Sequence, residues 1–536
     1  MKLLLFSLLT VPFVHAAFTT GDRNREVVMC VNSVHGGLDW YDSHSKAKME
    51  KTCRENVARI QFVNSINETG WAMADITITD SSVPDYIQGY SAGFVEGAAS
   101  RDIMDMHHYN LFHDYCVGAE AYCARLQTYL VDNLKFMRQY IAKYPDDPYW
   151  RQVNMTLAHM DGMIDGMIQL QAESYDLEVM FERPVALIKR RDHCSAIIKV
   201  TPGNANLLFA HNTWDSFASM LRVQRRISFA LPDLPGRTYT MSSYPGTLSS
   251  IDDFLISSAK LAIMETTNAA FDLSIFKKAS SRSVMTWIRS QVATRLANYG
   301  GEWVQIFTRY NSGTYNNQWM IVDYKLFTPG MAKLPKETFM ILEQFPGAIE
   351  VADRTEHLQN ERYWPSYNRP YFDKMFALGG YPYLVEVFGE YMSYNMTARA
   401  KIMRRDHSSV TDIDSLRKLM RYNNFLMDPL SQQPGCSPTG NAILSIAARS
   451  DLNPACNSCP IFDLNSADNV ATDYKITDAT LVKTLSFEAE SGPTRQGVPV
   501  FDWSTSQLRD KIRHSGHPTR WEFAPVTHVW GVDNLF

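Results

Sequence analysis

Residues 193–211 read HCSAIIKVTPGNANLLFAH and carry the strongest structural signal in the chain. Residues 195–200 and 205–210 are apolar segments of strand length, and the TPGN sequence between them is typical of a turn. This pattern predicts a β-hairpin. Whether the turn is the Pro-Gly pair alone or a four-residue loop with the same centre, Cys194 lies directly opposite His211, with Cβ atoms about 5 Å apart.

A thiol beside a histidine is a candidate nucleophile. The thiolate is the reactive form of cysteine, and a neighbouring cation lowers the pKa of the thiol. A cysteine at the head of an apolar strand is more often a small buried apolar residue. Taken on their own, the residues therefore leave two interpretations of Cys194 open, a catalytic one and a packing one.

The composition is that of a folded globular protein. The chain has 536 residues, a formal net charge of −5, 45% hydrophobic residues and 20% charged residues. The apolar content is sufficient for a large core, which excludes a mainly disordered protein. A nucleic-acid binder needs a surplus of basic residues, so we expect no nucleic-acid partner. The length predicts two or three domains, or one large elaborated domain.

The first sixteen residues differ from the rest of the chain. Lys2 is followed by an uncharged apolar run over residues 3–14, and small residues occupy the cleavage positions before Ala17. Residues 1–16 therefore predict a secretory signal peptide; the alternative is a buried N-terminal strand. No later stretch reaches the ~20 apolar residues of a membrane helix. We expect a secreted or lysosomal luminal protein without a transmembrane segment.

Two further features agree with the secretory pathway. Acceptor sequons for N-glycosylation occur at Asn67, Asn154 and Asn395. The chain also contains eight cysteines, and close pairs in an oxidising compartment are candidate disulfides. Spacing selects two pairs, Cys116 with Cys123 and Cys456 with Cys459. The CxxC of the second pair also occurs in redox and zinc sites, but no second CxxC accompanies it.

Two other motifs favour structural interpretations. Residues 89–93 read GYSAG and match the nucleophile elbow, with Ser91 as its serine, but no strand pattern precedes them. They fit a helix whose small residues allow close packing. His107, His108 and His113 with Asp114 lack the spacing of a helical metal pair, so a solvated or capped helix end is expected. No metal or cofactor is predicted.

The remaining segments indicate an α+β protein with layered sheets. Helical periodicity covers residues 84–144 and 150–171, and helical segments are expected at 251–264 and 281–297. Strands are expected at 75–79, 185–188, 304–307 and 320–324. The C-terminal third is rich in Pro, Asn and Asp, and predicts irregular structure wrapped on the core.

From about Gly89 to the C-terminus, and most densely after Cys194, the chain resembles the phospholipase B-like family of lysosomal and secreted glycoproteins. Several motifs in order carry the resemblance: HCSA (193–196), HNTW (211–214), WPSYN (364–368), ARAKIMRRD (398–406), RYNNF (421–425), DPLS (428–431), ARSDLNP (448–454) and GHP (516–518). Family members can carry a CxxC after DPLS. Here Gln433 stands in place of its first cysteine, which leaves Cys436 without a local partner.

The resemblance implies a four-layer αββα sandwich of the N-terminal nucleophile hydrolase type. Such proteins are made as inactive precursors, and autocatalytic cleavage between His193 and Cys194 would give associated fragments, a mostly helical 17–193 and a nucleophile-bearing 194–536. Cleavage gives Cys194 a free α-amine. Its pKa near ~8 lets this amine act as the base for its own thiol.

The resemblance also assigns roles to four further residues. Asn368 matches the oxyanion-hole donor, His211 and Trp214 match residues that line the nucleophile, and Arg399 matches the charged residue that orders the site. Simple packing for Trp214 and a structural ion pair for Arg399 are the alternatives.

The implied activity is deacylation of glycerophospholipids. The fold is commoner among amidases, so hydrolysis of lipid amides or small acylated amines is a second hypothesis. A non-catalytic lipid-binding glycoprotein is a third.

Overall fold

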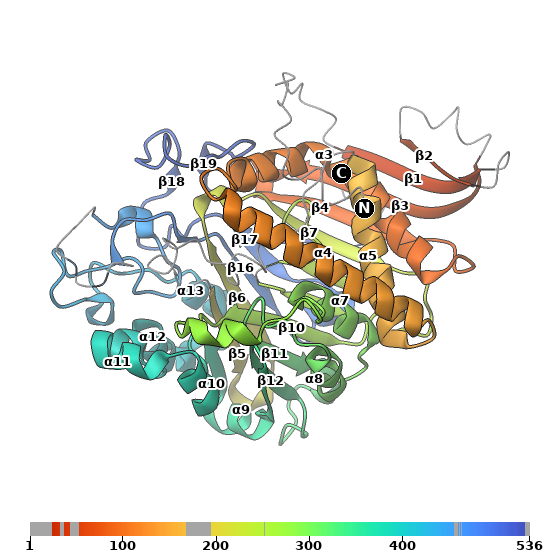
Figure 1. Cartoon of the computed structure of the whole chain (residues 1–536). Helices are drawn as coiled ribbons and strands as arrows, with labels where there is room; N and C mark the ends of the chain where they lie inside the picture. The colour runs from red at the N-terminus through yellow and green to blue at the C-terminus, as the bar shows by residue number, and fades with distance from the viewer. Residues whose placement is uncertain are drawn as a thin grey trace.

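The computed structural model describes residues 24–32, 37–42, 53–167, 194–250, 252–454, 459, 461 and 464–530. These residues form a mixed α+β fold with large sheets and several helices, which confirms the expected fold class (Figure 1). The predicted signal peptide, the strand expected at 185–188, His193 and Cys456 lie outside the described residues. Within the described residues, no helix has both the length and the apolar character needed to cross a membrane.

The larger sheet, which we call the first sheet, joins strands from the N-terminal part of the chain with strands from its middle part. In the described part it has eleven strands in the order β13-β12-β11-β10-β9-β8-β7-β4-β3-β1-β2. Their bounds are β1 (Asn24–Asn32), β2 (Leu38–Asp42), β3 (Cys53–Ser65), β4 (Trp71–Ile78), β7 (Arg222–Ser228), β8 (Thr238–Ser243), β9 (Leu255–Ser257), β10 (Leu261–Thr267), β11 (Asn317–Asp323), β12 (Phe339–Phe345) and β13 (Ala348–Asp353). The pairing of β4 with β7 is parallel and ties residues before 193 to residues after it.

The second sheet contains the predicted hairpin. Its described strands run β14-β5-β6-β16-β17-β20, and β15 also pairs with β6. Their bounds are β5 (Cys194–Val200), β6 (Leu207–Asp215), β14 (Tyr363–Ser366), β15 (Val470–Ala471), β16 (Asp473–Thr477), β17 (Glu488–Ser491) and β20 (Val526–Thr527); β18 (Phe501–Asp502) and β19 (Arg520–Trp521) form a separate pair. The C-terminal third therefore supplies strands to this sheet as well as irregular segments.

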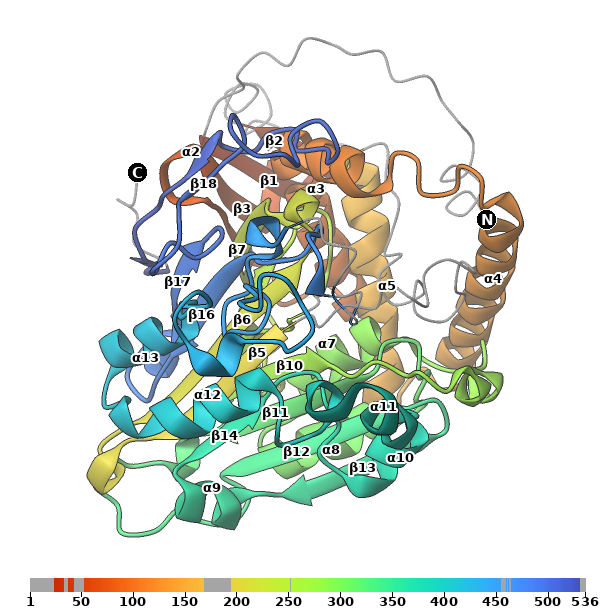
Figure 2. The ribbon, with the colours of Figure 1, turned by 90° about the vertical axis from the view of Figure 1, so that its left-hand side faces the viewer.

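Helices pack on the outer faces of the two sheets. The described helices are α2 (Ile66–Thr69), α3 (Asp85–Phe112), α4 (Glu120–Lys143), α5 (Pro148–Met167), α7 (Thr286–Leu296), α8 (Gly300–Thr308), α9 (Thr355–Glu361), α10 (Asp373–Leu378), α11 (Tyr381–Phe388), α12 (Ala398–Asp406) and α13 (Ile413–Met420). One buried apolar cluster packs α3, α5 and α8 against the first sheet. Another packs α12 and α13 against β5, β6 and β16 of the second sheet, on the side seen in Figure 2.

A third apolar cluster lies between the two sheets and identifies the inward face of the hairpin. Ala196 and Ile198 of β5 and Phe209 of β6 pack there against Met264 and Met320 of the first sheet. Side chains alternate along a strand, so Cys194 also points between the sheets, while Ile197 points towards α12 and α13. The inward face of the hairpin therefore carries the thiol into the interior of the protein.

The hairpin is real, but its predicted register is wrong by two residues. Cys194 pairs with Thr213, and His211 pairs with Ala196. The turn is centred one residue later than expected, because Gly203 (φ 68°) and Asn204 (φ 53°) both adopt the left-handed conformation. Displacing the turn by one residue moves every pair by two. The side-chain period of a strand is also two, so His211 stays on the same face as Cys194.

The GYSAG motif lies inside α3, as its residue pattern indicates. A Cβ atom added at Gly89 would lie 2.4 Å from the carbonyl oxygen of Met155, and one at Gly93 would lie 1.9 Å from that of His159. Both contacts are with the backbone of α5, so the glycines allow the two helices to approach closely. Ser91, two residues from each of these glycines, is also fully buried.

Two secondary-structure predictions are wrong. Residues 251–264, expected to be helical, contribute β9 and the start of β10, and residues 304–307, expected to be a strand, belong to α8. All seven residues of β10 are buried, and its first four, LAIM, form an apolar run without alternation. Short apolar runs of this kind do not distinguish a buried strand from a buried helix.

Candidate functional site

Both backbone groups of Cys194 are held by residues from distant segments. Its N–H donates to Oδ1 of Asn368 at 3.3 Å, and its carbonyl oxygen accepts from Nη1 of Arg399. The side chain is fully buried and is a thiol. Asn368 and Arg399, both predicted for the site, therefore contact the Cys194 backbone directly.

Asn368 adopts an uncommon backbone conformation that fixes its amide. Its φ is +66°, a left-handed value that asparagine tolerates better than most residues. Nδ2 donates to the carbonyl oxygen of Thr267 at 2.8 Å. The carbonyl oxygen of Asn368 accepts from Nη1 of Arg369 at 2.9 Å and from the hydroxyl of Tyr381 at 3.2 Å. One of the two amide hydrogens on Nδ2 is thus engaged by the Thr267 carbonyl.

His211 lies diagonally across the hairpin from Cys194. Its Nε2 donates to the carbonyl oxygen of Glu265 at 2.9 Å, so Nδ1 carries the lone pair. Nδ1 has no hydrogen-bond partner among the described residues. Burial, with a further contribution from the positive charge of Lys475, holds the pKa of His211 well below its usual value. The imidazole is therefore neutral and can accept a proton at Nδ1.

Trp214 and Arg399 lie on the opposite face of the hairpin from the thiol. The Arg399 guanidinium stands 4.3 Å from the centre of the Trp214 ring and also donates to the hydroxyl of Ser195 at 3.2 Å. Its Nη2 donates to the carbonyl oxygen of Tyr367 at 2.8 Å. The indole therefore packs on Arg399, and its predicted place beside the nucleophile is limited to its backbone, which hydrogen-bonds to Cys194.

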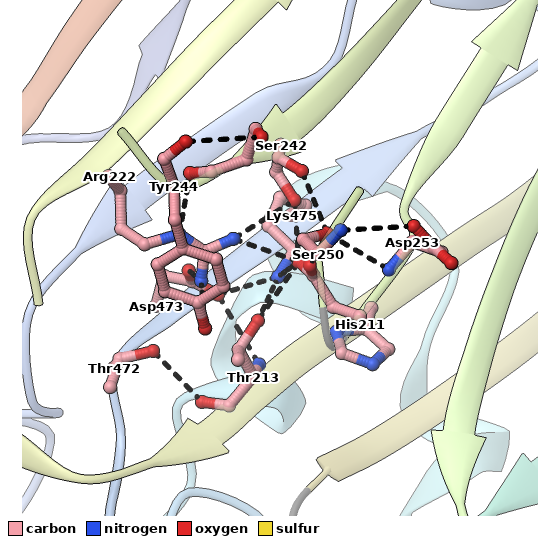
Figure 3. Close-up of polar contacts among 12 residues, drawn as sticks. His211, Thr213, Arg222, Ser242, Tyr244, Ser250, Asp253, Thr472, Asp473 and Lys475 are labelled. Atoms are coloured by element: carbon pink, nitrogen blue, oxygen red, sulfur yellow. Dashed lines mark hydrogen bonds and ion pairs between the residues drawn. The ribbon is translucent and has the colours of Figure 1, made fainter. Parts of the chain in front are cut away.

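A buried cluster of charges, absent from the sequence-based prediction, adjoins the thiol. It consists of Arg222 and Lys475 with Asp252 and Asp473, all of them fully buried (Figure 3). Two cations balance two anions. Burial raises the pKa of Asp252, but Lys475 and Arg222 outweigh this effect and hold that pKa well below its usual value.

Thr213 connects the charged cluster to Cys194. It is the cross-strand partner of Cys194, its hydroxyl donates to Asp252 at 3.0 Å, and it accepts from Lys475. Lys475 and Asp473 alternate with Tyr474 and Ile476 along β16. This alternation is typical of a strand with a solvated face, which explains why sequence reasoning missed the cluster.

The thiol of Cys194 is protonated at rest. Burial raises its pKa well above the usual value, and the carboxyl of Glu265 raises it further. Burial also raises the pKa of Glu265 itself well above its usual value. Attack by Cys194 therefore requires a base that removes the proton in place.

Single charge removals in the cluster are expected to move the pKa of Cys194 in opposite directions. Asp252→Asn leaves an excess positive charge and should lower that pKa, whereas Lys475→Met leaves an excess negative charge and should raise it. The pH dependence of Cys194 alkylation by iodoacetamide, followed by mass spectrometry on folded variants, measures the shift. Displacement of both profiles in the same direction would contradict an electrostatic role.

The other predicted residues lie apart from this site. Asn67 and Asn395 are exposed, and Asn154 is half-buried with its Oδ1 accepting from Arg138.

Cys116 is bonded to Cys123, the pair indicated by spacing. The expected Cys456–Cys459 pair is wrong, because Cys459 is bonded to Cys436. Cys436 belongs to a buried apolar cluster, and Cys459 packs against the same cluster. Among the described residues no group of His, Cys, Asp and Glu is arranged to hold a metal ion.

Comparison with known proteins identifies the family. The phospholipase B family model matches residues 58–183 and 167–528. The protein named "Putative phospholipase B-like 1" of Caenorhabditis elegans is 40% identical over 538 residues, covering 95% of this chain and 94% of that protein. "Putative phospholipase B-like 2" of Homo sapiens is 41% identical over 507 residues, covering 88% and 86%. "Phospholipase B-like protein B" of Dictyostelium discoideum is 34% identical over 511 residues, covering 88% and 85%. This chain therefore belongs to the phospholipase B-like family.

Proposed function

We propose that the chain is an acyl hydrolase that matures by autoproteolysis and uses Cys194 as its N-terminal nucleophile on acylated glycerophospholipids. One observation carries the proposal: the backbone nitrogen that cleavage would free lies 3.3 Å from the amide of Asn368. Cys194 would then supply both the base, its α-amine, and the nucleophile, its thiol. The neighbouring Asn368 would supply the donor for the oxyanion. The printed names of the relatives support a phospholipid substrate.

Maturation would begin with attack of the Cys194 thiol on the carbonyl carbon of residue 193. The bond between that carbon and the nitrogen of Cys194 breaks, and the nitrogen takes up the proton that left the thiol. Nδ1 of His211 is on the same face and has a lone pair to carry this proton. Its lowered pKa makes it a weak base, which is sufficient for a step that occurs once. Water then hydrolyses the thioester, leaving a carboxylate at residue 193.

Turnover would repeat the chemistry with the α-amine as the base. The amine accepts the thiol proton, the thiolate attacks the acyl carbon of the substrate, and Nδ2 of Asn368 donates to the oxyanion. The leaving alcohol takes the proton. Water hydrolyses the acyl-thioester and restores the thiol. Arg399, which holds the carbonyl oxygen of Cys194, keeps the new N-terminus in position.

The architecture supports the finer fold proposal as well. Helices, the first sheet, the second sheet and α12 with α13 pack in that order, which is consistent with a four-layer αββα sandwich of the N-terminal nucleophile hydrolase type. The fragments 17–193 and 194–536 would stay associated through the β4–β7 pairing and the helices packed on it. We further propose passage through the secretory pathway, to the lysosome or the exterior, with glycans on the sequons.

Purified mature protein is expected to contain two polypeptides. Cleavage of the signal peptide and of the 193–194 bond gives fragments of 177 and 343 residues, about 20 and 39 kDa before glycans add mass. Intact-mass analysis and Edman sequencing of the larger fragment measure this. A larger fragment beginning at any residue other than Cys194 would contradict the proposed maturation, whereas trimming of the smaller fragment would not.

The substrate class is tested by comparing wild-type protein with Cys194→Ala on the same lipids. Phospholipid vesicles and N-acyl amides are incubated with each protein, and released fatty acids are quantified. Ester cleavage by the wild type alone supports the proposal. Cleavage of amides alone selects the amide hydrolase, which the maturation step favours because it breaks an amide bond itself. Equal amounts of fatty acid from both proteins would contradict both hydrolase hypotheses and leave the third, a non-catalytic lipid-binding glycoprotein.

A further inference from the structure

The buried carboxylate of Glu343, which is linked to the Asn368 loop by hydrogen bonds, has no role in the chemistry proposed above. Glu343 lies in β12, is fully buried, and pairs across the strands with Gln318 of β11. Its neighbours Phe339 and Ile341 on the same face belong to the apolar cluster between the sheets. Glu343 therefore points into the interior between the sheets, the same space into which Cys194 points.

Four N–H groups donate to this carboxylate. Oε1 accepts from Nε2 of Gln318 at 2.7 Å, from the backbone nitrogen of Tyr371 at 2.7 Å and from Nδ2 of Asn268 at 3.4 Å. Oε2 accepts from the backbone nitrogen of Phe372 at 3.2 Å. A carboxylate is the side-chain group that only accepts, so this set of donors matches the ionised form.

Three of the four donors come from the two chain segments that hold Asn368, and the fourth is Gln318 of β11. Asn268 follows Thr267, whose carbonyl oxygen accepts from the Asn368 amide. Tyr371 and Phe372 follow Asn368 by three and four residues. One carboxylate thus ties the acceptor of the Asn368 amide to the loop that carries Asn368. Loss of these bonds would leave the left-handed loop held mainly by Arg369 and Tyr381.

The neutral form of Glu343 has a different set of partners. Burial raises the pKa of Glu343 to about 7, although the bonds from Tyr371 and Gln318 oppose this effect. A protonated carboxyl must donate its hydrogen. Oε1 of Gln318 already accepts from the indole of Trp364 at 3.1 Å, whereas Oδ1 of Asn268 is buried with no hydrogen-bond partner among the described residues. Rotation of the Asn268 amide would present that oxygen to Glu343.

Charged and titratable groups around this carboxylate come from four elements. Tyr394 lies close enough for Glu343 to raise its pKa. The guanidinium of Arg354 is 5.0 Å from the centre of the Tyr371 ring, and the centres of the His357 and Tyr371 rings are 6.5 Å apart. Glu350 lies opposite Glu343 on β13 but is partly exposed and paired with Lys374. Glu343 itself accepts three N–H groups from the two segments and a fourth from Gln318 of β11.

We propose that Glu343 is a positioning residue for Asn368, holding the oxyanion donor as a carboxylate and loosening it as a neutral acid. The proposal rests on the role of Asn368 in the proposed function. The ionised form fixes both segments through three N–H bonds and is itself anchored to β11 by Gln318. The neutral form exchanges the bond from Asn268 for a bond to the rotated amide of the same residue. Turnover should therefore be faster when Glu343 is ionised.

The experiment compares processed wild-type protein with Glu343→Gln between pH 5 and 8.5. The wild-type to variant ratio of kcat should rise from about 1 at pH 5 to about 10 at pH 8.5, the effect of one hydrogen bond. Taking the ratio removes the titration of the α-amine, which both proteins share. In an Asn368→Gly background the ratio should stay near 1 at every pH. Glu350→Gln is the matched control, and its ratio to wild type should not change with pH.

A second readout does not depend on hydrolysis. Because folding raises the pKa of Glu343, its contribution to stability is present below about 4.5 and is lost as pH rises through about 7. The Tm of the wild type should therefore fall relative to Glu343→Gln over this range. The Glu343→Gln and Asn368→Gly changes in Tm should be additive at pH 5 and non-additive at pH 8.

Each outcome bears on the proposal separately from the proposed function. Additive Tm changes at both pH values overturn it, whether or not the protein hydrolyses a lipid. A rate ratio that rises with pH equally in the Asn368→Gly background also overturns it, because Glu343 would then act elsewhere. Non-additive Tm changes in a protein without hydrolase activity support the positioning role and count against the hydrolase.

Discussion

Replacing Cys194 by alanine is expected to leave a full-length chain with no hydrolase activity. Both maturation and turnover need a nucleophilic atom on this side chain, and a methyl group supplies none. The substitution removes one buried sulfur and disturbs no hydrogen bond of the Cys194 backbone, so the variant should fold. Intact mass, circular dichroism and fatty-acid release, measured on the same preparation, check the three parts of this expectation.

Two further variants answer separate questions. One separates maturation from turnover, and the other tests whether the GYSAG motif rather than Cys194 supplies the nucleophile. Cys194→Ser should still cleave slowly, because a hydroxyl can make the same acyl shift, but a hydroxyl is a weaker nucleophile near neutral pH. Ser91→Ala should keep activity, since Ser91 is buried within α3, a helix that packs on the outer side of the first sheet. Loss of activity in Ser91→Ala, with labelling of Ser91 by a fluorophosphonate, would move the nucleophile to the GYSAG motif.

The sequence predicts the hairpin and the inward face of Cys194, but not the cross-strand pairing. The positions of strands follow from local composition, whereas the register depends on the backbone angles of Gly203 and Asn204. The predicted register is wrong by two residues, so His211 is still placed on the correct face, but Thr213 is missed as the cross-strand partner of Cys194. The wrong disulfide has a similar origin. Proximity in sequence favoured Cys456 for Cys459, whereas tertiary folding brings Cys436 to it.

The charged residues of the site were harder to predict than the residues named by the family motifs. Asp473 and Lys475 lie on one strand, far in sequence from Asp252 and Arg222, and each looks like a surface residue in its own segment. Their burial becomes apparent only when β16 is placed in the second sheet beside β6. The same holds for Glu343, because its four donors come from three distant segments. Local patterns carry no information on such contacts between segments.

Removing the amide of Asn368 is expected to slow turnover by about 100- to 1000-fold, or about 3–4 kcal/mol of transition-state stabilisation, as for other oxyanion donors. Asn368→Ala alone is ambiguous, because a Cβ-bearing apolar residue at φ +66° also strains the backbone. Asn368→Gly removes the amide without this strain. Equal losses of kcat in the two variants would therefore measure the donor itself.

A matched control for Asn368 lies in another part of the molecule. Asn133 of α4 is also fully buried and donates to the carbonyl oxygens of Ser281 and Ser283. Asn133→Ala should lower the Tm and leave the kcat of the folded, processed enzyme unchanged, because Asn133 contacts no residue of the Cys194 site. An unchanged kcat in Asn368→Gly as well would remove Asn368 from the site. The 3.3 Å contact between the Cys194 nitrogen and the Asn368 amide would then no longer support the proposed function.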